Sequence, residues 1–308
     1  QRGDSVEYEC HKGVTGFKNP GDSCFMDSTL MSMFFLVDSP FYDGIFNAMV
    51  SSGGAQCSRD PAENKRLKEE VKALIKSDVE RIIKGEVGYK CVKLRNLIGK
   101  TCRGDDEDMS RGTHDAAMFF RRLVELVGYE ACQWRLTTYR ETSPEDKNSI
   151  TTGGSTLEVT TTRDKPHVTW PGMWGQTFEY NDIAKVNVVT DREFVSAEVI
   201  VVQVNRSENA NKVVRGSNTR LKLVYNNRPV VVDKELHIPF TDGTRRTFIL
   251  RAAVYAPYWG HYAAILKCDD NWLNYDDVNA GKSYDANIVE EKEVEEILTT
   301  KATLLFYY

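Results

Sequence analysis

Cys24 is the residue of this sequence that is best placed to act as a nucleophile. It follows the turn-forming stretch NPGDS and begins CFMDSTLMSMFFL, residues 24–36, whose apolar spacing predicts a helix. A cysteine attacks as the thiolate, and a helix N-terminus beside an imidazolium lowers a cysteine pKa from about 8.5 to roughly 3.5–7.5. This pattern predicts acyl-transfer chemistry at Cys24, and a buried structural cysteine is the alternative.

His261 and Asp276 offer the base that such a cysteine needs. His261 lies in GHYAAIL, a strand-like segment, and is the best partner among the five histidines of the chain. Asp276 follows 15 residues later, after a second apolar segment, which fits two antiparallel strands joined by a turn at residues 269–271. We therefore predict a triad in the order Cys, His, Asp.

Acyl transfer also needs hydrogen-bond donors for the developing oxyanion. Asn19, five residues before the cysteine, offers a side-chain amide, and the Cys24 backbone N–H offers a second donor. A turn-forming role is the alternative for Asn19, because Asn-Pro-Gly is itself a turn signal. Gly260 has no side chain, so an extended substrate backbone could pass close to the histidine.

The elements that must position these residues change in type along the chain. Helices are predicted at 24–36, at 63–85 and at 114–127, where His114 and Asp115 begin and cap the helix. After about residue 133 the sequence turns to Thr-rich, Val-rich and aromatic runs that indicate strands, namely LEVTTTR, AEVIVVQV, RLKLVY, RPVVV, RTFILRAAVYA and the closing ATLLFYY. Residues 141–155 are polar and predict a mobile connection, and ANIVEEKEVEEIL predicts an acidic helix.

Composition narrows the class of protein. The 308 residues are 41% hydrophobic and 28% charged, with a formal charge of -5 and no long basic stretch, so we expect a folded protein that does not bind nucleic acid. No apolar run is long enough to span a bilayer, and no signal peptide is evident. Seven scattered cysteines, an odd number with no CxxC pair, favour a reducing, cytoplasmic setting without a structural zinc site. Because residue 1 is Gln, we expect the sequence to be a piece of a longer chain.

Two segments resemble the cysteine and histidine boxes of the ubiquitin-specific proteases. In GFKNPGDSCFMDSTLMSMFF, residues 16–35, the matching positions are Gly16, Asn19, Gly21, Cys24, Phe25, Met26 and Ser28, while Asp27 replaces the usual Asn. The segment GHYAAILKCDDNWLNYDDV, residues 260–278, is similar to the histidine box in its Gly-His-Tyr start, its Trp272 and its aromatic-Asp-Asp end. Weaker similarity lies in THDAAMFFRRLVEL, where Asp115, Ala116 and Phe119 match.

The resemblance implies a site and a fold. It implies a triad of Cys24, His261 and Asp276, an oxyanion role for Asn19, and a supporting or water-polarising role for Asp277. It also implies substrate contacts, which we expect at Gly260, Tyr262, Asp115 and Trp272. The implied fold is α+β and papain-like: one domain over residues 1–308, with a helical thumb at about 16–132 and fingers and a palm sheet at about 133–308. Paired zinc-binding cysteines are lacking, so short, metal-free fingers and no cofactor are expected.

The implied function is hydrolysis of the bond after the C-terminal Gly-Gly of ubiquitin or polyubiquitin through a Cys24 thioester. The divergent boxes resemble the CYLD-type branch, which implies a preference for linear or other extended chains. Three alternatives remain: a protease for a ubiquitin-like modifier, a catalytically inactive ubiquitin-binding scaffold, and a transglutaminase-like or acetyltransferase-like enzyme. A secreted effector that acts in a host cytosol is the alternative to a resident cytoplasmic enzyme.

Overall fold

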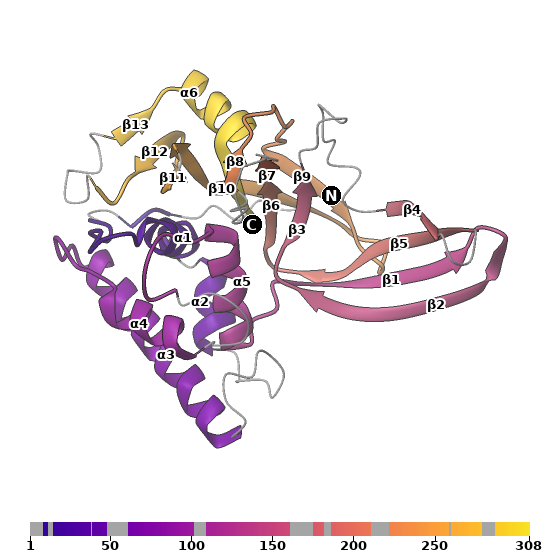
Figure 1. The fold of residues 1–308 in the computed structure, drawn as a ribbon, viewed down its shortest axis with the longest axis horizontal. Coiled ribbons are helices and arrows are strands. Elements are labelled where there is room, and N and C mark those ends of the chain that lie inside the picture. The colour runs from indigo at the N-terminus through magenta and orange to yellow at the C-terminus, as the bar shows by residue number, and fades with distance from the viewer. Residues whose placement is uncertain are drawn as a thin grey trace, which may run out of the picture.

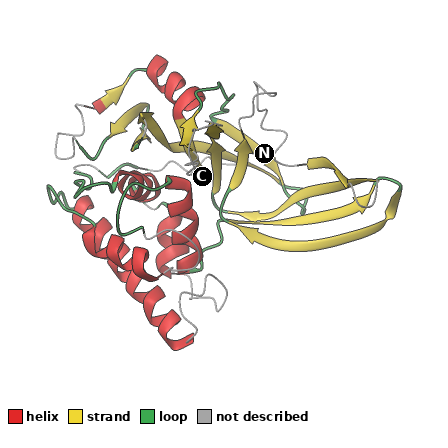
Figure 2. Cartoon of the chain, in the orientation of Figure 1, coloured by secondary structure: helices red, strands yellow, loops and turns green. Residues whose placement is uncertain are grey.

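The structure, a computed structural model, describes residues 9–11, 15–37, 39–47, 61–101, 109–160, 175–181, 186–210, 222–258, 260–278 and 287–308. Helices α1 to α5 occupy one side of the molecule, the strands and α6 occupy the other, and a ribbon of long strands projects away from both (Figures 1 and 2). The predicted change from helix to strand along the chain is confirmed. No helix in the described ranges is long and apolar enough to cross a membrane.

The helices carry clear sequence signals for their ends. In α5 the Asp115 side chain caps the first turn by accepting from the Met118 N–H at 2.9 Å, and Gly128 ends the helix with φ of 71°. The predicted helix over 63–85 is observed as α3, followed by Gly85 with φ of 81°. The helical bounds are α1 Cys24–Phe34, α2 Pro40–Tyr42, α3 Pro61–Ile83, α4 Val92–Thr101, α5 Ala116–Val127 and α6 Glu291–Glu296, with π-helical segments Asp43–Asn47 and Ile297–Lys301.

The central sheet joins strands from the second half of the chain. Its order is β13 (Ile288–Val289), β12 (Asn271–Tyr275), β11 (His261–Cys268), β10 (Arg245–Tyr258), β14 (Ala302–Tyr307), β6 (Ile200–Asn205) and β3 (Leu157–Thr160), with β9 (Glu235–Pro239) also paired to β10. The β3–β6 pair is parallel and the other pairs are antiparallel. This order places the C-terminal strand in the middle of the sheet.

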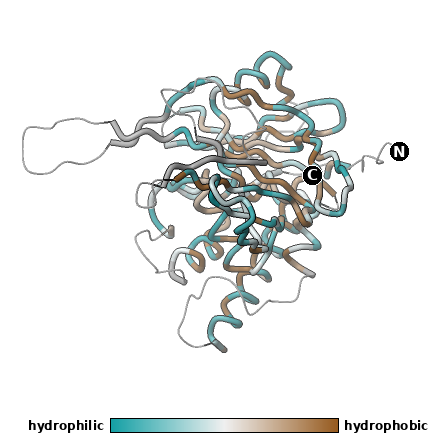
Figure 3. The backbone as a smooth tube through the Cα atoms, turned by 90° about the vertical axis from the view of Figure 1, so that its right-hand side faces the viewer, coloured by the Kyte–Doolittle hydropathy of each residue, from teal (hydrophilic) through white to brown (hydrophobic). Residues whose placement is uncertain are grey.

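Both faces of the middle of the central sheet are buried, which explains why β14 is buried at every position. In β14, Leu304 and Phe306 pack against the helices, whereas Leu305 and Tyr307 pack in a second core on the opposite face. Hydrophobic segments accordingly run through the interior of the molecule (Figure 3). Helices α1 and α5 lie on the first face, so the sheet and α1 share one core.

The projecting ribbon is a second sheet with the order β2 (Ser143–Gly154), β1 (Cys132–Arg140), β5 (Val186–Ala197) and β4 (Gly175–Asn181). The prediction of a mobile connection at 141–155 is wrong, because most of this segment is strand β2, paired along its length with β1. Residues 144–150 of β2 are all exposed, so the strand has no apolar alternation to reveal it. The RPVVV segment, residues 228–232, is not a strand. A separate pair joins β7 (Ser207–Ala210) to β8 (Lys222–Tyr225).

The cysteines are partly paired. Cys10 and Cys268 form a disulfide that ties the N-terminal segment to the end of β11 across 258 residues of sequence. Cys24, Cys91 and Cys132 are free and buried, and Cys57 and Cys102 lie outside the described residues. A disulfide is a feature of oxidising conditions, so it runs against the reducing setting that the cysteine count favoured.

Candidate active site

Cys24 opens α1 at the end of a loop that Asn19 organises. The Asn19 Oδ1 accepts from the backbone N–H of Gly21 at 2.7 Å and of Ser23 at 3.3 Å, and from the Ser23 hydroxyl at 3.2 Å. Gly21 has φ of 124°, a value that suits glycine. The amides of Met26 and Asp27 both donate to the Ser23 carbonyl, so the Cys24 N–H precedes the first amides that the helix uses internally. The thiol therefore lies at a helix N-terminus, as the sequence predicted.

His261 lies beside this thiol at the start of β11. Its Nε2 is 3.0 Å from the Asp276 Oδ1, and the ring interacts with the Cys24 thiol closely enough for that contact to raise the pKa of the imidazole. The Cys24 Sγ lies 4.0 Å from the carbonyl oxygen of Gly260, whose φ of 81° turns the chain into the strand. The ring of Tyr258 stacks on the imidazole, with 5.1 Å between ring centroids. The imidazole is thus held between a nucleophile and a carboxylate.

The charges of the site follow from these contacts. Hydrogen bonds to Asp276 and to Cys24 raise the pKa of His261 to about 10, so the ring is an imidazolium at neutral pH. Burial pushes the pKa of Asp276 upward, but hydrogen bonds from His261 and from the Val278 N–H, the latter at 3.1 Å, hold it below its usual value. The turn between β11 and β12 that brings Asp276 to the ring lies where the sequence predicted it, at Asp269 and Asp270.

Asp277, the next residue, is 1% exposed. It lies next to Asp27 of α1 and to the Asn19 amide, and burial raises its pKa to about 6. Neither of its carboxylate oxygens makes a hydrogen bond of good geometry within the described part of the chain. Asp277 is therefore buried near the triad in an acidic pair that the sequence did not suggest, and its supporting role stays a prediction.

The four residues expected to contact substrate have different surroundings. Asp115 accepts from the Tyr262 hydroxyl at 3.3 Å, which connects the first turn of α5 to the strand that carries His261. Gly260 is exposed beside the thiol. Trp272 is 3% exposed and packs in the second core, with Lys267 over its ring, so it supports the sheet and is not a substrate-contacting residue.

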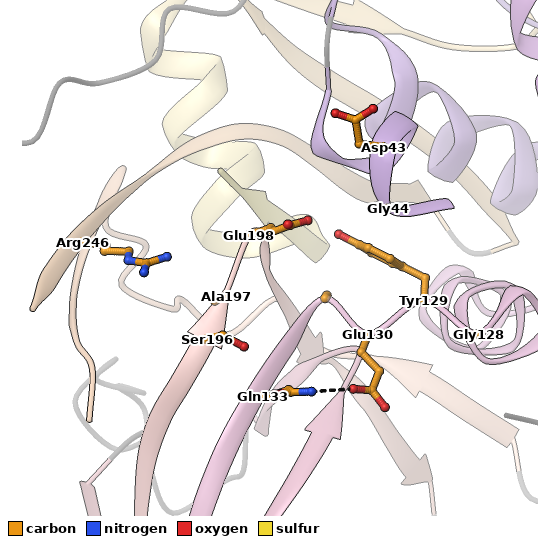
Figure 4. A pocket seen from close by; sticks show the side chains of 11 residues that line it. Asp43, Gly44, Gly128, Tyr129, Glu130, Gln133, Ser196, Ala197, Glu198 and Arg246 are labelled. Carbon is orange, nitrogen blue, oxygen red and sulfur yellow. Dashed lines mark hydrogen bonds between the residues drawn. The ribbon is translucent and has the colours of Figure 1, made fainter. Parts of the chain in front are cut away.

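A cavity of about 370 Å³ begins at Asp115 and runs between α5 and the edge of the central sheet. Carboxylates line it at Asp115 and Glu158, and the Arg121 guanidinium donates to the Gln203 side chain across it at 2.6 Å. A second cavity, of about 510 Å³, lies at the other end of α5, where Tyr129, Glu130, Glu198 and Arg246 surround it (Figure 4). None of the predicted site residues lines the second cavity, so it is separate from the cysteine site.

Sequence reasoning did not find the residue that holds the cysteine loop. Arg95 of α4 is 7% exposed and donates to three carbonyls, those of Gly21 at 2.5 Å, Met109 at 3.1 Å and Gly112 at 2.6 Å. Its guanidinium also lies 5.7 Å from the centre of the Phe25 ring. A single arginine on an amphipathic helix reads as a solvated residue, so no signal in the sequence could have distinguished it.

Two groups of potential metal ligands occur among the described residues. In one, Cys10 and Cys268 lie near Asp269, but both sulfurs are consumed by the disulfide. The other consists of His261, Asp276 and Asp277, whose proximity the histidine–aspartate hydrogen bond already explains. The expectation that the site needs no metal stays a prediction.

Comparison with known proteins identifies the family. The family model for ubiquitin carboxyl-terminal hydrolase matches residues 15–307, which include both boxes and nearly all of the described fold. The comparison with curated proteins found no match. A match over almost the whole chain establishes the family and with it the α+β, papain-like fold of the ubiquitin-specific type. The chain belongs to the ubiquitin carboxyl-terminal hydrolase family and is a cysteine-type ubiquitin hydrolase.

Proposed function

We propose that Cys24 attacks the carbonyl carbon of the last glycine of ubiquitin, with His261 as the proton carrier and Asp276 as the group that orients it. The observation that carries this assignment is the array in which Asp276 accepts from Nε2 of the buried His261 and the same ring interacts with Cys24. The protonated ring beside the sulfur supplies the proton that the leaving amine needs. Nothing else among the described residues combines a thiol, an imidazole and a carboxylate in this way.

The chemical steps follow from the positions of these groups. The thiolate adds to the carbonyl carbon, and the negative charge that develops on the oxygen is stabilised by the Cys24 N–H and the Asn19 amide. The imidazolium donates its proton to the departing amine, which leaves a thioester on Cys24. Neutral His261 then removes a proton from water, the hydroxide adds to the thioester, and the thiolate leaves with ubiquitin free. We propose that the helical lobe and the sheet lobe form one catalytic domain, because each lobe contributes residues to this site.

We propose that the extended C-terminal tail of ubiquitin passes through the cavity between α5 and β3–β6. The Asp115–Tyr262 hydrogen bond places one end of this cavity beside the strand that carries the histidine. Asp115 and Glu158, together with Arg121 and Arg206, give the cavity polar groups of both charges, and the exposed Gly260 leaves room for a glycine backbone at the thiol. We further propose a preference for linear or other extended chains, which is supported by the resemblance of the two boxes to the CYLD-type branch.

The experiment that tests the assignment is reaction with ubiquitin carrying a C-terminal propargyl group, read by intact mass. We expect one adduct on the parent chain and none on Cys24→Ala. A matched control is Cys91→Ala, because Cys91 is also a free buried cysteine but lies in the segment before α4. This control should still form the adduct.

The same probe separates the alternatives. If the folded parent chain forms no adduct with ubiquitin but forms one with a ubiquitin-like modifier, that modifier is the substrate in place of ubiquitin. A chain that binds ubiquitin without any adduct is the inactive scaffold. Hydrolysis of linear and of lysine-linked diubiquitin, compared at equal enzyme concentration, tests the chain preference.

A further inference from the structure

Asp27 is a carboxyl group in a position where its charged form is strongly disfavoured. It lies in the first turn of α1, three residues after Cys24, and is 0% exposed. Its Oδ2 accepts from the Ser23 hydroxyl at 2.5 Å, while its Oδ1 has no hydrogen bond of good geometry in the described part of the chain. An isolated carboxylate in such a place costs several kcal/mol, so the group is expected to keep its proton.

The group that faces Asp27 is the other buried carboxyl, Asp277. The two carboxyl groups lie next to each other. The Asp27 Oδ1 and both Asp277 oxygens are buried without another hydrogen-bond partner in the described part of the chain. Two carboxylates this close cannot both be charged without strong repulsion. Burial raises the pKa of Asp27 well above its ordinary value, whereas the pKa of Asp277 rises only to about 6. At neutral pH, Asp27 is therefore the donor of the pair and Asp277 the acceptor.

Asn19 is the third member of this contact. Its carbonyl end is held by the Gly21 and Ser23 amides, which leaves its NH2 end to face the Asp277 carboxylate. The same NH2 group is the predicted oxyanion donor. A change in the position of Asp277 would therefore change the direction of the Asn19 NH2 group, which is the predicted oxyanion donor.

We propose that Asp27 is a positioning residue: its carboxyl group donates a hydrogen bond to Asp277, and Asp277 in turn fixes the Asn19 amide in the direction of the oxyanion. This role rests on the proposed function of the site. Asp27 stands where the family box usually has Asn, so the chain retains a donor at this position but uses one that can ionise. Loss of the Asp27 proton at high pH replaces the hydrogen bond by repulsion and releases Asn19.

The charged and titratable groups around the pair set the pH at which this happens. On the sheet side, the pair is faced by His261 of β11, Tyr275 of β12 and Asp276, which follows β12. On the helical side, it is faced by Arg95 of α4 and by Cys91, the residue before α4. Arg95 and the His261 imidazolium favour ionised carboxylates, whereas burial and the like charge oppose them. The balance makes Asp27 the last carboxyl of the site to ionise.

The test compares Asp27→Asn, which keeps a donor, with Asp27→Leu, which has the same number and branching of side-chain heavy atoms and no donor. The readouts are kcat and KM for a fluorogenic ubiquitin C-terminal amide between pH 6 and 10. We expect Asp27→Leu to lose at least about tenfold in kcat with little change in KM, because an oxyanion donor is worth about 10²–10³ and is misdirected here. We expect Asp27→Asn to keep kcat at pH 7 within about threefold and to lose less activity than the parent chain at high pH.

Asp78→Asn is the matched control, because Asp78 is also buried and acidic but is held by the Tyr89 hydroxyl at 2.6 Å in the α3 region. It should leave the pH profile of kcat unchanged. The proposal is overturned if Asp27→Leu has the same kcat as the parent chain. It is also overturned if the kcat of Asp27→Asn is as low as that of Asp27→Leu. If Asp27→Leu does not fold, the pH profile of Asp27→Asn decides, and a profile identical to the parent overturns it. An inactive parent chain overturns the proposed function and the Asp27 role with it, whereas failure of the variants in an active chain overturns the Asp27 role alone.

Discussion

Replacement of Arg95 by Met should loosen the loop that holds Cys24. The guanidinium is the only group among the described residues that joins this loop to the segments around Met109 and Gly112 by side-chain hydrogen bonds. Met fills a similar volume but donates nothing. The fold should survive with a less well-placed cysteine.

The cost of Arg95→Met can be estimated from the surroundings of the three carbonyls. Gly21 and Gly112 are exposed, so water can replace the arginine there, whereas Met109 is 1% exposed and keeps an unpaired carbonyl, which costs about 1–3 kcal/mol. Loss of the cation–π contact with Phe25 adds about 1 kcal/mol. We expect the free energy of unfolding to fall by about 2–4 kcal/mol and kcat to fall by about tenfold or more, because small misplacements of a nucleophile are costly.

Arg206→Met is the matched control for this experiment. Arg206 is also buried and also donates to three carbonyls, of which Ala302 is the fully buried one, but it ties β14 to the segments around Arg228 and Thr299. Urea unfolding should show similar losses of stability for both variants. Because Arg206 also lines the cavity proposed for the ubiquitin tail, its replacement is expected to raise KM for a fluorogenic ubiquitin substrate, whereas a loss of kcat is expected for Arg95→Met only. Equal kcat values for the two variants would refute a specific role of Arg95 in placing the cysteine.

Three further predictions follow from the charges and the disulfide. Asp276→Ala removes the main cause of the raised His261 pKa, so the alkaline limb of the kcat/KM profile should move from about 10 toward 6.5. The raised pKa stabilises the folded state below pH 6.5, and this gain is lost as the pH rises through 10. The variant should therefore be less stable than the parent chain at pH 7 but not at pH 11. Asp27 has a pKa that is higher folded than unfolded, so its ionisation opposes folding as pH rises, and Asp27→Asn should raise the melting temperature at pH 8 but not at pH 4; an equal change at both values contradicts the assignment. Cys10→Ser should lower the free energy of unfolding by about 3–5 kcal/mol, because the disulfide closes a loop of 258 residues, and a reductant should destabilise the parent chain but not this variant.

The parts of the fold that the sequence predicted correctly are those with strong local signals. Apolar spacing and end signals located α1, α3 and α5, and the final apolar run located β14. The failure at 141–155 has a local cause too, since β2 is polar and exposed on both faces and is stabilised by pairing with β1. Whether a segment forms a strand depends on the strand that it pairs with as well as on its own residues, so the composition of residues 141–155 could not reveal β2.

The order and type of the reactive groups could be predicted from the sequence: a cysteine that begins a helix, a histidine that begins a strand, and an aspartate after the next strand. Each of these depends on local backbone structure. Which groups surround them depends on how distant segments pack. The contact of Asp27 with Asp277 joins residues 250 positions apart, the Arg95 contact with the loop depends on how α4 packs, and Trp272 is buried because the sheet is covered on both faces. Each of these contacts depends on how far apart in space two segments lie that are remote in sequence. Side-chain packing fixes that distance, and local propensity does not.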